Sequence, residues 1–334
     1  MRHGAVTILD VAREAGVSRA AVSKVIRDAY GVSDEMRVKV EEAIQRLGYR
    51  PSVAARAIRG ASRTIGFELH QIENPALARI LSGAVAAMSE TGYQLVVAPA
   101  SEPDRTGHEA LDALLDLGVD GLVAVAPHAE SEQLEALAAR LPLVLLSRHT
   151  TSPTFDTVTG DDAAGTRLAL EHLFAAGHDR VAHFTIGTAA TSRAGSPPTV
   201  RMTTYLETMR ETGRTDLAQV VHVDDAADAH SATARLLDGP TPPTAVFAAF
   251  DALALEVLHV VRERGLTASD LAVVGYDNLR ITSHPGLSLS SVDQLGDELG
   301  RRAVRLLLER IGGRTEAKHE MTTPQLLVRA SSST

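Results

Sequence analysis

A short segment near the start of the chain carries side chains that can bind DNA on one face of a predicted helix. Helical spacing over residues 18–27 separates an apolar face from a polar face. The residues on the polar face are Arg19, Ala20, Ser23, Lys24 and Arg27. Guanidinium and ammonium groups donate hydrogen bonds to guanine edges, and hydroxyl groups bind phosphates. This face predicts a helix whose N-terminal half enters a major groove.

Local signals define the two helices that position this face. Thr7 can cap a first helix, with Asp10 three residues later at its positive end. Gly16 can take the left-handed conformation that ends this helix, and Ser18 can cap the second. The expected buried stripes are Ile8, Val11, Ala12 and Ala15, then Ala21, Val22, Val25 and Ile26. The pattern favours a helix-turn-helix, although an ordinary helical hairpin would show the same spacing.

A third helix and a change in net charge extend this prediction. Ser33 begins the helix and Gly48 ends it. Its core positions are Met36, Val40, Ile44 and Leu47. Residues 1–63 hold 12 Lys and Arg against 7 Asp and Glu, whereas the remaining 271 residues hold 21 against 35. A basic first fifth on an acidic protein is expected to face an anionic polymer, although any one of these cations alone could be a solvated surface charge.

Long motifs in a fixed order resemble the LacI/GalR family of transcription regulators. They are VTILDVAREAGVSRAAVSKVIR (6–27), VSDEMRVKVEEAIQRLGYRPSVAARAIR (32–59), RTIGF (63–67), TAVFAAFDALAL (244–255), LAVVGYDN (271–278) and LSSVDQ (289–294). The resemblance covers nearly the whole chain. It implies a three-helix DNA-binding head, a hinge helix, and a two-lobed core like that of periplasmic sugar-binding proteins. It also implies a dimer whose affinity for DNA is set by a small effector.

Beyond residue 63, continuous apolar strands alternate with helices, which predicts an α/β core of parallel sheets with helices on both faces. The predicted strands are Thr64–Leu69, Gln94–Ala98, Gly121–Ala126, Leu143–Ser147, Val181–Ile186, Val220–Val223, Ala245–Phe250 and Leu271–Tyr276. The predicted helices include Pro75–Glu90, Gly165–Ala176, Ala252–Arg264 and Leu295–Ile311. With the resemblance, we expect a helix-turn-helix head over 1–50, a hinge helix over 51–62, an N-terminal lobe from 63–160 with 293–322, and a C-terminal lobe from 161–292 with 323–334.

The resemblance assigns base reading to Arg19, Ala20 and Lys24. Arg19 and Lys24 can donate to guanine O6 and N7, whereas Ala20 offers only an apolar contact, such as to a thymine methyl group. The groups suited to phosphate contacts are Thr7, Ser18, Ser23, Arg27 and Ser33. The chain departs from the family at Ala21, where Thr is usual, and at Lys24, where Arg is usual. A lysine makes a point-charge contact in place of a bidentate one.

In the hinge, Ala55 and Ile58 match the family's minor-groove residues, with Ile58 in place of the usual intercalating leucine. An apolar wedge between base steps kinks the duplex. A β-branched wedge is stiffer and is expected to insert less deeply. Hinge segments of this kind order mainly on binding. The alternative for Ile58 is therefore a linker residue that folds onto the core.

A ligand cleft is expected at the carboxyl ends of the parallel strands. By resemblance, Arg201 holds the ligand with a fork that suits paired hydroxyls or a carboxylate, and Asp277 accepts hydrogen bonds from it. The full set of predicted effector-binding residues is Asn74, Ser147, Arg148, Arg201, Phe250, Asp277 and Gln294. Phe250 could stack on a sugar or base ring, or it could be plain core. Ser147 stands where the family usually has Asp, so one expected carboxylate is missing.

Composition and spacing give little support to other function classes. The chain has no cysteine, and no apolar run reaches membrane-spanning length. Glu68, His70 and Glu73 are a weak metal candidate, and the neighbouring side chains of Asp161 and Asp162 should diverge. We therefore predict no catalytic residue, no metal site and no cofactor. With no signal-peptide pattern at the N-terminus, we expect a cytoplasmic protein.

The sequence thus predicts an effector-controlled, sequence-specific DNA-binding transcriptional regulator, a repressor of genes for carbohydrate or related small-molecule metabolism. The expected partners are double-stranded palindromic operator DNA, a small-molecule effector such as a sugar or sugar derivative, and a second copy of the chain, with no membrane. No leucine heptad follows the last long helix, so we expect a homodimer through apolar core helices such as 76–88 rather than a tetramer. The alternatives are a small-solute-binding protein of the periplasmic type and a hydrolase of sugars.

Overall fold

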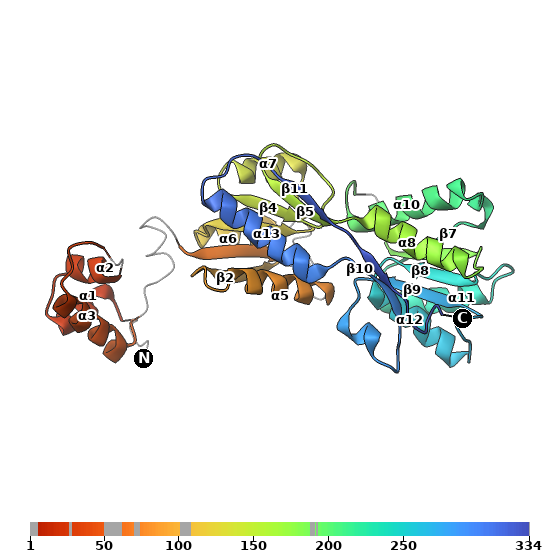
Figure 1. The fold of residues 1–334 in the computed structure, drawn as a ribbon, viewed down its shortest axis with the longest axis horizontal. Helices are drawn as coiled ribbons and strands as arrows, with labels where there is room; N and C mark the ends of the chain where they lie inside the picture. The colour runs from red at the N-terminus through yellow and green to blue at the C-terminus, as the bar shows by residue number, and fades with distance from the viewer. Residues whose placement is uncertain are drawn as a thin grey trace. The chain divides into compact units, whose positions relative to one another are not determined.

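The computed structural model describes residues 6–26, 29–49, 62–69, 74–100, 108–187, 191 and 193–333. Contacts divide the chain into two compact units, Met1–Ser62 and Arg63–Thr334 (Figure 1). The predicted phosphate contact Arg27 and the predicted minor-groove residues Ala55 and Ile58 lie outside the described residues, as does nearly all of the predicted hinge helix.

The first unit contains three helices, α1 (Ile8–Ala15), α2 (Arg19–Ile26) and α3 (Asp34–Leu47). Their ends lie where the sequence places them, because the capping groups are local. Thr7 and Asp10 form a capping box at the start of α1, and Gly16 ends this helix with a φ of 68°. Ser33 caps α3 by accepting a hydrogen bond from its first turn. The buried core between the three helices includes Val11, Val22, Val40 and Ala43.

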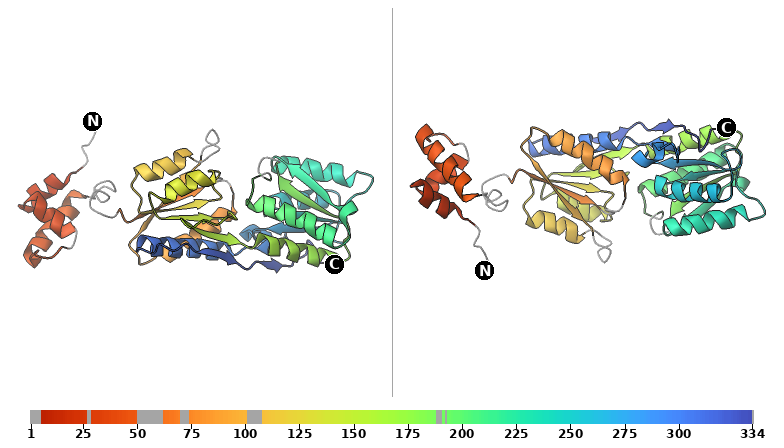
Figure 2. Two further views of the ribbon diagram at one scale, coloured as in Figure 1. Left: turned by 90° about the horizontal axis from the view of Figure 1, so that it is seen from above. Right: turned by 90° about the horizontal axis from the view of Figure 1, so that it is seen from below.

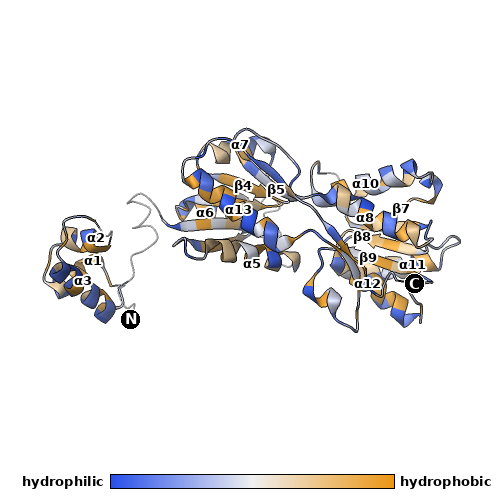
Figure 3. Cartoon of the chain, in the orientation of Figure 1, coloured by the Kyte–Doolittle hydropathy of each residue, from blue (hydrophilic) through white to orange (hydrophobic). Residues whose placement is uncertain are grey.

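The second unit begins with a lobe built on a six-stranded parallel sheet in the order β11-β5-β4-β3-β1-β2. Its strands are β1 (Thr64–Leu69), β2 (Gln94–Pro99), β3 (Gly121–Val125), β4 (Leu143–Leu146), β5 (Asp156–Gly160) and β11 (His319–Thr322). One face packs against α5 (Ala76–Met88) and α13 (Gly296–Ile311). The other face packs against α6 (His108–Asp116) and α7 (Ser131–Ala138). Figure 3 shows apolar strands between these helices.

The other lobe has a six-stranded sheet in the order β12-β10-β9-β8-β6-β7. Its strands are β6 (Val181–Ile186), β7 (Gln219–Val223), β8 (Ala245–Ala248), β9 (Ala272–Tyr276), β10 (Ser290–Asp293) and β12 (Gln325–Leu327). Its covering helices are α8 (Asp162–Ala175) and α10 (Pro197–Glu211) on one face, and α11 (Ala226–Leu237) and α12 (Asp251–Glu263) on the other. The prediction of parallel sheets needs one correction, because β12 runs antiparallel to β10.

Within the described part of the chain, the backbone passes between the two sheets at residues 160–162, 293–296 and 322–325 (Figure 2). The four strands β5, β10, β11 and β12 flank these passages, and sequence analysis did not predict them. They are three to five residues long and carry polar side chains, so no apolar run marks them. The predicted strand ending at Phe250 stops at Ala248, because Phe250 is already the residue before α12.

Helices α5 and α13 approach each other unusually closely. A Cβ atom at Gly83 would lie 1.9 Å from the carbonyl oxygen of Asp297, and one at Gly300 would lie 1.9 Å from that of Ile80. Much of the apolar surface of α5 is consequently buried inside its own lobe. The exposed residues on α5 are Ala78, Ser82, Val85, Ala86 and those just beyond its ends. The dimer contact predicted for this helix is therefore limited to these residues. No described helix has the length and apolarity that a membrane crossing requires.

Candidate DNA-binding surface and effector cleft

Helix α2 separates buried and exposed residues as its sequence predicts. Val22 and Val25 are buried, while Arg19, Ala20 and Lys24 are exposed. The three predicted base-reading residues therefore share one exposed face of a helix whose other face is fixed in the core. Such a helix can enter a groove without exposing apolar core to water.

The predicted phosphate-contacting hydroxyls serve first as helix caps. Ser18 accepts a hydrogen bond from the N–H of Ala21 at 3.1 Å, and Ser33 accepts one from that of Met36 at 3.3 Å. A hydroxyl that accepts in this way keeps a proton that it can donate to phosphate. Thr7 differs, because its hydroxyl donates to Oδ2 of Asp10 at 2.7 Å. Ser23 is half-buried on α2.

In the second unit, Arg201 of α10 is almost fully buried and lies among side chains from several elements. Its Nε donates to Oδ1 of Asp162 at 2.7 Å, and its Nη1 donates to the carbonyl oxygen of Ala249. Its guanidinium carbon lies 3.5 Å from the ring centroid of Tyr276 and 5.2 Å from that of Phe250. A planar cation that is hydrogen-bonded and packed against aromatic rings is rigid, and a rigid guanidinium suits the recognition of hydroxyl pairs or carboxylates.

Asp162 accepts hydrogen bonds on both of its oxygens. Its Oδ1 binds Arg201, and its Oδ2 lies 2.6 Å from Nε2 of His149, which follows β4 in the other lobe. Burial opposes the charged form of Asp162, but Arg201 and His149 outweigh this and hold its pKa below the usual value. The preceding carboxylate, Asp161, caps α8 through the N–H of Ala164. The predicted divergence of Asp161 and Asp162 is confirmed.

Asp277 follows β9 with a φ of 105°, a backbone conformation that is strained for any residue with a side chain. Its Oδ1 accepts a hydrogen bond from Nε2 of Gln294 at 2.6 Å. Burial raises the pKa of Asp277 to about 7, although Arg201 acts in the opposite direction. This carboxyl group can therefore be protonated or ionised near neutral pH, and can donate to a ligand as well as accept from it.

A second buried carboxyl group, Asp251, lies at the start of α12. Its Oδ1 accepts from the hydroxyl of Ser291 at 2.6 Å, and its Oδ2 accepts from the N–H of Leu279 at 2.7 Å. Burial and the nearby Asp277 raise the pKa of Asp251 to about 8. These hydrogen bonds fix the loop that follows Asp277, so Asp251 helps to hold Asp277 in place.

Asn74 lies just before helix α5, and its side chain binds the first residue of that helix. Its Oδ1 accepts a hydrogen bond from the N–H of Ala76 at 3.0 Å. One turn later, Arg79 donates from Nη1 to the carbonyl oxygens of Asp277 and Asn278, each at 3.3 Å. The first turns of α5 therefore meet the strand end that carries Asp277, and an arginine joins the two lobes there.

Ser147 and Arg148 follow β4, and Phe250 precedes α12. Ser147 is half-buried with a φ of 57°. Arg148 donates from Nη1 to the carbonyl oxygens of Pro127 and Ala129, so part of its guanidinium is used inside its own lobe. Phe250 is half-buried against the apolar core, and its ring lies against the Arg201 guanidinium. Its stacking on a ligand ring stays a prediction.

The structure joins some predicted effector residues directly and leaves others apart. Arg201 contacts Phe250, and Gln294 contacts Asp277, whereas Asn74 and Arg148 form hydrogen bonds with other partners in the described residues. Three members of the cluster around Arg201 were not predicted from the sequence, namely His149, Asp162 and Tyr276. Asp162 follows β5, a short polar strand that the local pattern does not mark, so no sequence signal pointed to it.

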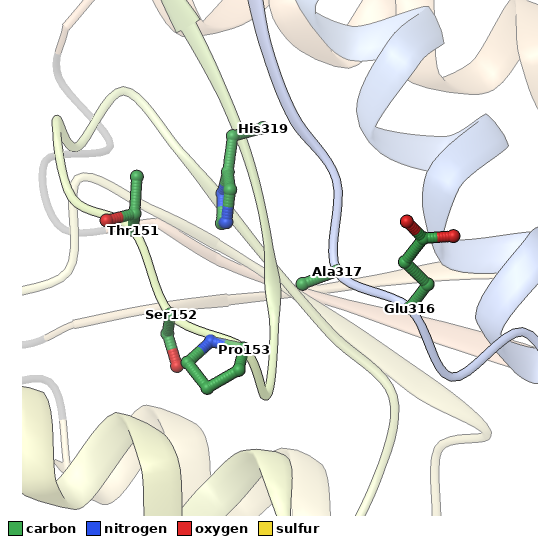
Figure 4. Close-up of a pocket in the computed structure, with 6 residues that line it drawn as sticks. All are labelled: Thr151, Ser152, Pro153, Glu316, Ala317 and His319. Atoms are coloured by element: carbon green, nitrogen blue, oxygen red, sulfur yellow. The ribbon is translucent and has the colours of Figure 1, made fainter.

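A hollow of about 510 Å³ lies elsewhere in the N-terminal lobe. Its lining residues are Thr151, Ser152, Pro153, Glu316, Ala317 and His319 (Figure 4). The Glu316 carboxylate and the His319 ring lie well apart in Figure 4, so their polar groups do not converge on one point. None of the predicted effector residues lines this hollow.

Comparison with known families matches two parts of the chain. Residues 7–52 match the model described as bacterial regulatory proteins, lacI family, and residues 170–332 match a periplasmic binding protein-like domain. The ribose operon repressor of Escherichia coli K12 is 30% identical over 332 residues, which is 97% of this chain and 99% of that protein. Catabolite control protein A of Priestia megaterium is 31% identical and covers 90% of this chain and 91% of its own length.

Solved structures align over nearly the full length. The lac repressor dimer bound to operator and the anti-inducer ONPF is 26% identical, with a TM-score of 0.82, and covers 99% of this chain and 100% of that chain. The complex of the transcriptional regulator CelR with cellobiose is 30% identical, with a TM-score of 0.69, and covers 98% of this chain and 99% of that chain. The fold therefore has the two-lobed core and helix-turn-helix head that the sequence predicts.

Proposed function

The chain belongs to the LacI family of bacterial regulatory proteins, and we propose that its α2 helix reads operator DNA under the control of a ligand bound around Arg201 and Asp277. The protein is an effector-controlled DNA-binding transcriptional repressor. A protein with this role acts in the cytoplasm, where bacterial DNA lies.

The observation that carries the DNA-binding proposal is the exposed face of α2. Arg19, Ala20 and Lys24 lie on it together, over a helix whose opposite face is buried. Two copies of such a short recognition helix are needed to read a site of useful length, so the operator is a palindrome with half-sites about one helical turn apart. The lac repressor structure that aligns with this chain is a dimer bound to operator.

The test separates base reading from phosphate binding. Operator sequences are first selected from random duplexes with the full-length protein, and affinities are then measured by fluorescence anisotropy at two salt concentrations. Lys24→Ala should weaken binding to the selected operator by about 1–3 kcal/mol and have much less effect on random DNA. Lys39→Ala is the matched control, since Lys39 is exposed on α3 and paired with Glu35.

Two results would contradict this assignment. An equal loss on both kinds of DNA would make Lys24 a phosphate contact. Failure to select any common sequence would remove the proposal that the head is sequence-specific.

The chemistry around Arg201 favours a small ligand rich in hydroxyl groups. Within the described residues, Nε and Nη1 of Arg201 donate hydrogen bonds to protein groups and Nη2 does not. Nη2 can therefore donate to a ligand. Asp277 can accept or donate, and Phe250 offers one ring face. Sugars combine paired hydroxyls with an apolar ring face, so we infer a sugar or sugar derivative as effector and carbohydrate or related genes as targets. CelR, which aligns with this chain, was solved with cellobiose.

The effector site is tested with one variant. A panel of pentoses, hexoses, disaccharides and purine bases is screened for compounds that raise the Tm of the full-length protein and change its operator affinity. Asp277→Ala should abolish the response to the active compound and leave operator affinity without it nearly unchanged, because Asp277 belongs to the second unit and the predicted DNA contacts to the first. A variant that responds normally, or that no longer binds operator at all, would show that Asp277 does not have this role.

A further inference from the structure

We propose that His230, His259 and Glu263 form a binding site for a divalent transition-metal ion such as Zn²⁺ on the surface of the C-terminal lobe. His230 lies on α11, and His259 and Glu263 lie one turn apart on α12. The two helices pack side by side on one face of the sheet (Figure 1). The opposite face carries α10 with Arg201, so this proposal does not depend on the effector cleft.

The three side chains already converge on one point. Nε2 of His230 lies 2.8 Å from Oε2 of Glu263, and Nε2 of His259 lies 3.5 Å from Oε1 of Glu263. Their ligand atoms all lie within 4.8 Å of one another. In the described part of the chain, this is the only group of three or more His, Cys, Asp or Glu residues that meets this criterion.

These distances are close to those of a zinc site. Bonds of about 2.0–2.2 Å at tetrahedral angles place neighbouring ligand atoms about 3.4 Å apart. The side chains of His230, His259 and Glu263 are 33%, 58% and 52% exposed, so small rotations can complete the geometry and water can supply the fourth ligand. Two imidazoles and one carboxylate suit zinc, nickel or copper, whereas Mg²⁺ and Ca²⁺ prefer oxygen ligands alone.

A neighbouring carboxylate also supports metal binding. Nδ1 of His259 lies 3.9 Å from Glu256, whose carboxylate can orient the ring once Nε2 holds the metal. A surface ion pair alone would contribute little to stability, whereas a shared metal would tie α11 to α12.

The experiment uses full-length protein without a histidine tag, stripped of metal with a chelator. Zn²⁺ is titrated by calorimetry and by competition with a chromophoric chelator, and Co²⁺ is used as a spectroscopic probe. We expect one Zn²⁺ per chain, the visible bands of tetrahedral cobalt, and a Tm that rises by about 5 °C at a 100-fold excess over Kd. Mg²⁺ should give no such shift.

Variants decide which residues hold the ion. His259→Ala and Glu263→Gln should each weaken Zn²⁺ binding at least 10-fold, and the double variant should lose the cobalt bands. His222→Ala is the control, because His222 is exposed on β7 outside the cluster. All variants should keep the metal-free Tm of the wild type, since the altered side chains are largely exposed. Unchanged zinc affinity in the double variant, or no binding by the wild type, would overturn the proposal.

Discussion

Two buried carboxyl groups near Arg201 have opposite protonation behaviour, and their partners explain it. Asp162 is paired directly with Arg201 and with His149, so its pKa is lowered despite burial. Among the described residues, only the neutral amide of Gln294 donates a hydrogen bond to the Asp277 carboxyl group, so burial dominates and the pKa of Asp277 rises to about 7. The cluster around Arg201 therefore holds one fixed anion beside one group whose pKa lies near neutral pH.

The raised pKa of Asp277 makes a prediction about stability. The folded protein retains a proton on Asp277 up to about pH 7, whereas the unfolded chain releases it near pH 4. Since the native state binds more protons at Asp277 in this interval, the contribution of Asp277 to the free energy of unfolding falls as pH rises from about 4 to 7. Asp277→Asn cannot ionise and still accepts from Gln294, so it should raise Tm relative to the wild type at pH 8 and much less at pH 5.

The measurement is thermal unfolding followed by circular dichroism at both pH values. Asp216→Asn, which changes an exposed carboxylate, should show no such pH-dependent gain. If Asp277→Asn raised Tm equally at pH 5 and pH 8, ionisation of Asp277 would not be the cause of the gain, and the prediction would be wrong. Asp251, with a pKa of about 8, is unchanged in Asp277→Asn and Asp216→Asn, so both variants keep its contribution to the pH dependence of stability.

How well each residue could be predicted depends on how far away its partners lie in the sequence. The caps at Thr7 and Ser33 involve groups three residues away, so the local pattern contained them. Arg201 was found through the family resemblance. Its partner Asp162 is 39 residues distant, and only the topology of the lobe brings the two together. The sequence alone does not encode such a pair in any spacing rule.

At the scale of elements, the close contact between α5 and α13 within the N-terminal lobe positions an arginine that reaches the other lobe. Gly83 and Gly300 let the two helices approach, because any side chain there would meet backbone of the facing helix. Their close packing holds Arg79 of α5 against Asp297 at 3.0 Å and against Asp293 at 2.9 Å. From this position Arg79 also reaches the carbonyl oxygens of Asp277 and Asn278 in the other lobe.

Arg79 should therefore contribute to the coupling between the lobes. Hydrogen bonds to charged groups contribute about 1.5–3 kcal/mol. A loss of that size lowers Tm by roughly 3–10 °C in a unit as large as residues 63–334. Arg79→Ala should show this decrease and should broaden the distribution of distances between spin labels placed one in each lobe, because the arginine bridges the two.

Arg301→Ala is the control for Arg79→Ala. Arg301 lies on α13 and pairs with Glu298 at 3.0 Å, but it is 48% exposed, and such a surface pair contributes about 0–1 kcal/mol. If the two variants lose equal stability and the label distances do not change, Arg79 does not couple the lobes.

The elements themselves were predictable where one continuous apolar run formed them. Strands β1 and β6 have the bounds expected from sequence, because each is mainly apolar and lies between two parallel strands. Strand β11 was missed, because it becomes a strand only by pairing with β5, more than 150 residues earlier. Long-range pairing of this kind leaves no periodicity in the short segment itself.

At the scale of the whole molecule, the remaining question is which surface joins two copies. Helix α5 keeps an exposed strip after its own lobe is packed, with Ala78, Ser82, Val85 and Ala86 along it. Val85 is 56% exposed, and the residues of the strip are small, so a second copy can approach closely. The edge strand β2 is also only half-buried. An apolar strip of this kind fits a homodimer contact through the core.

Val85→Glu tests this contact, because it places an uncompensated charge in the centre of the strip. An unpaired charge buried in an interface costs about 2–5 kcal/mol, so the Kd of the dimer should rise at least 30-fold. Sedimentation velocity at micromolar concentration should show a dimer for the wild type and a shift to monomer for the variant. Affinity for the selected palindrome should fall toward that of a single half-site, because one head then binds without the other.

Leu117→Glu is the control for Val85→Glu, since Leu117 is 45% exposed next to α6 on the opposite face of the sheet. A dimer that survives Val85→Glu, or that dissociates equally with Leu117→Glu, would exclude α5 as the interface, and a stable tetramer in the wild type would contradict the predicted assembly.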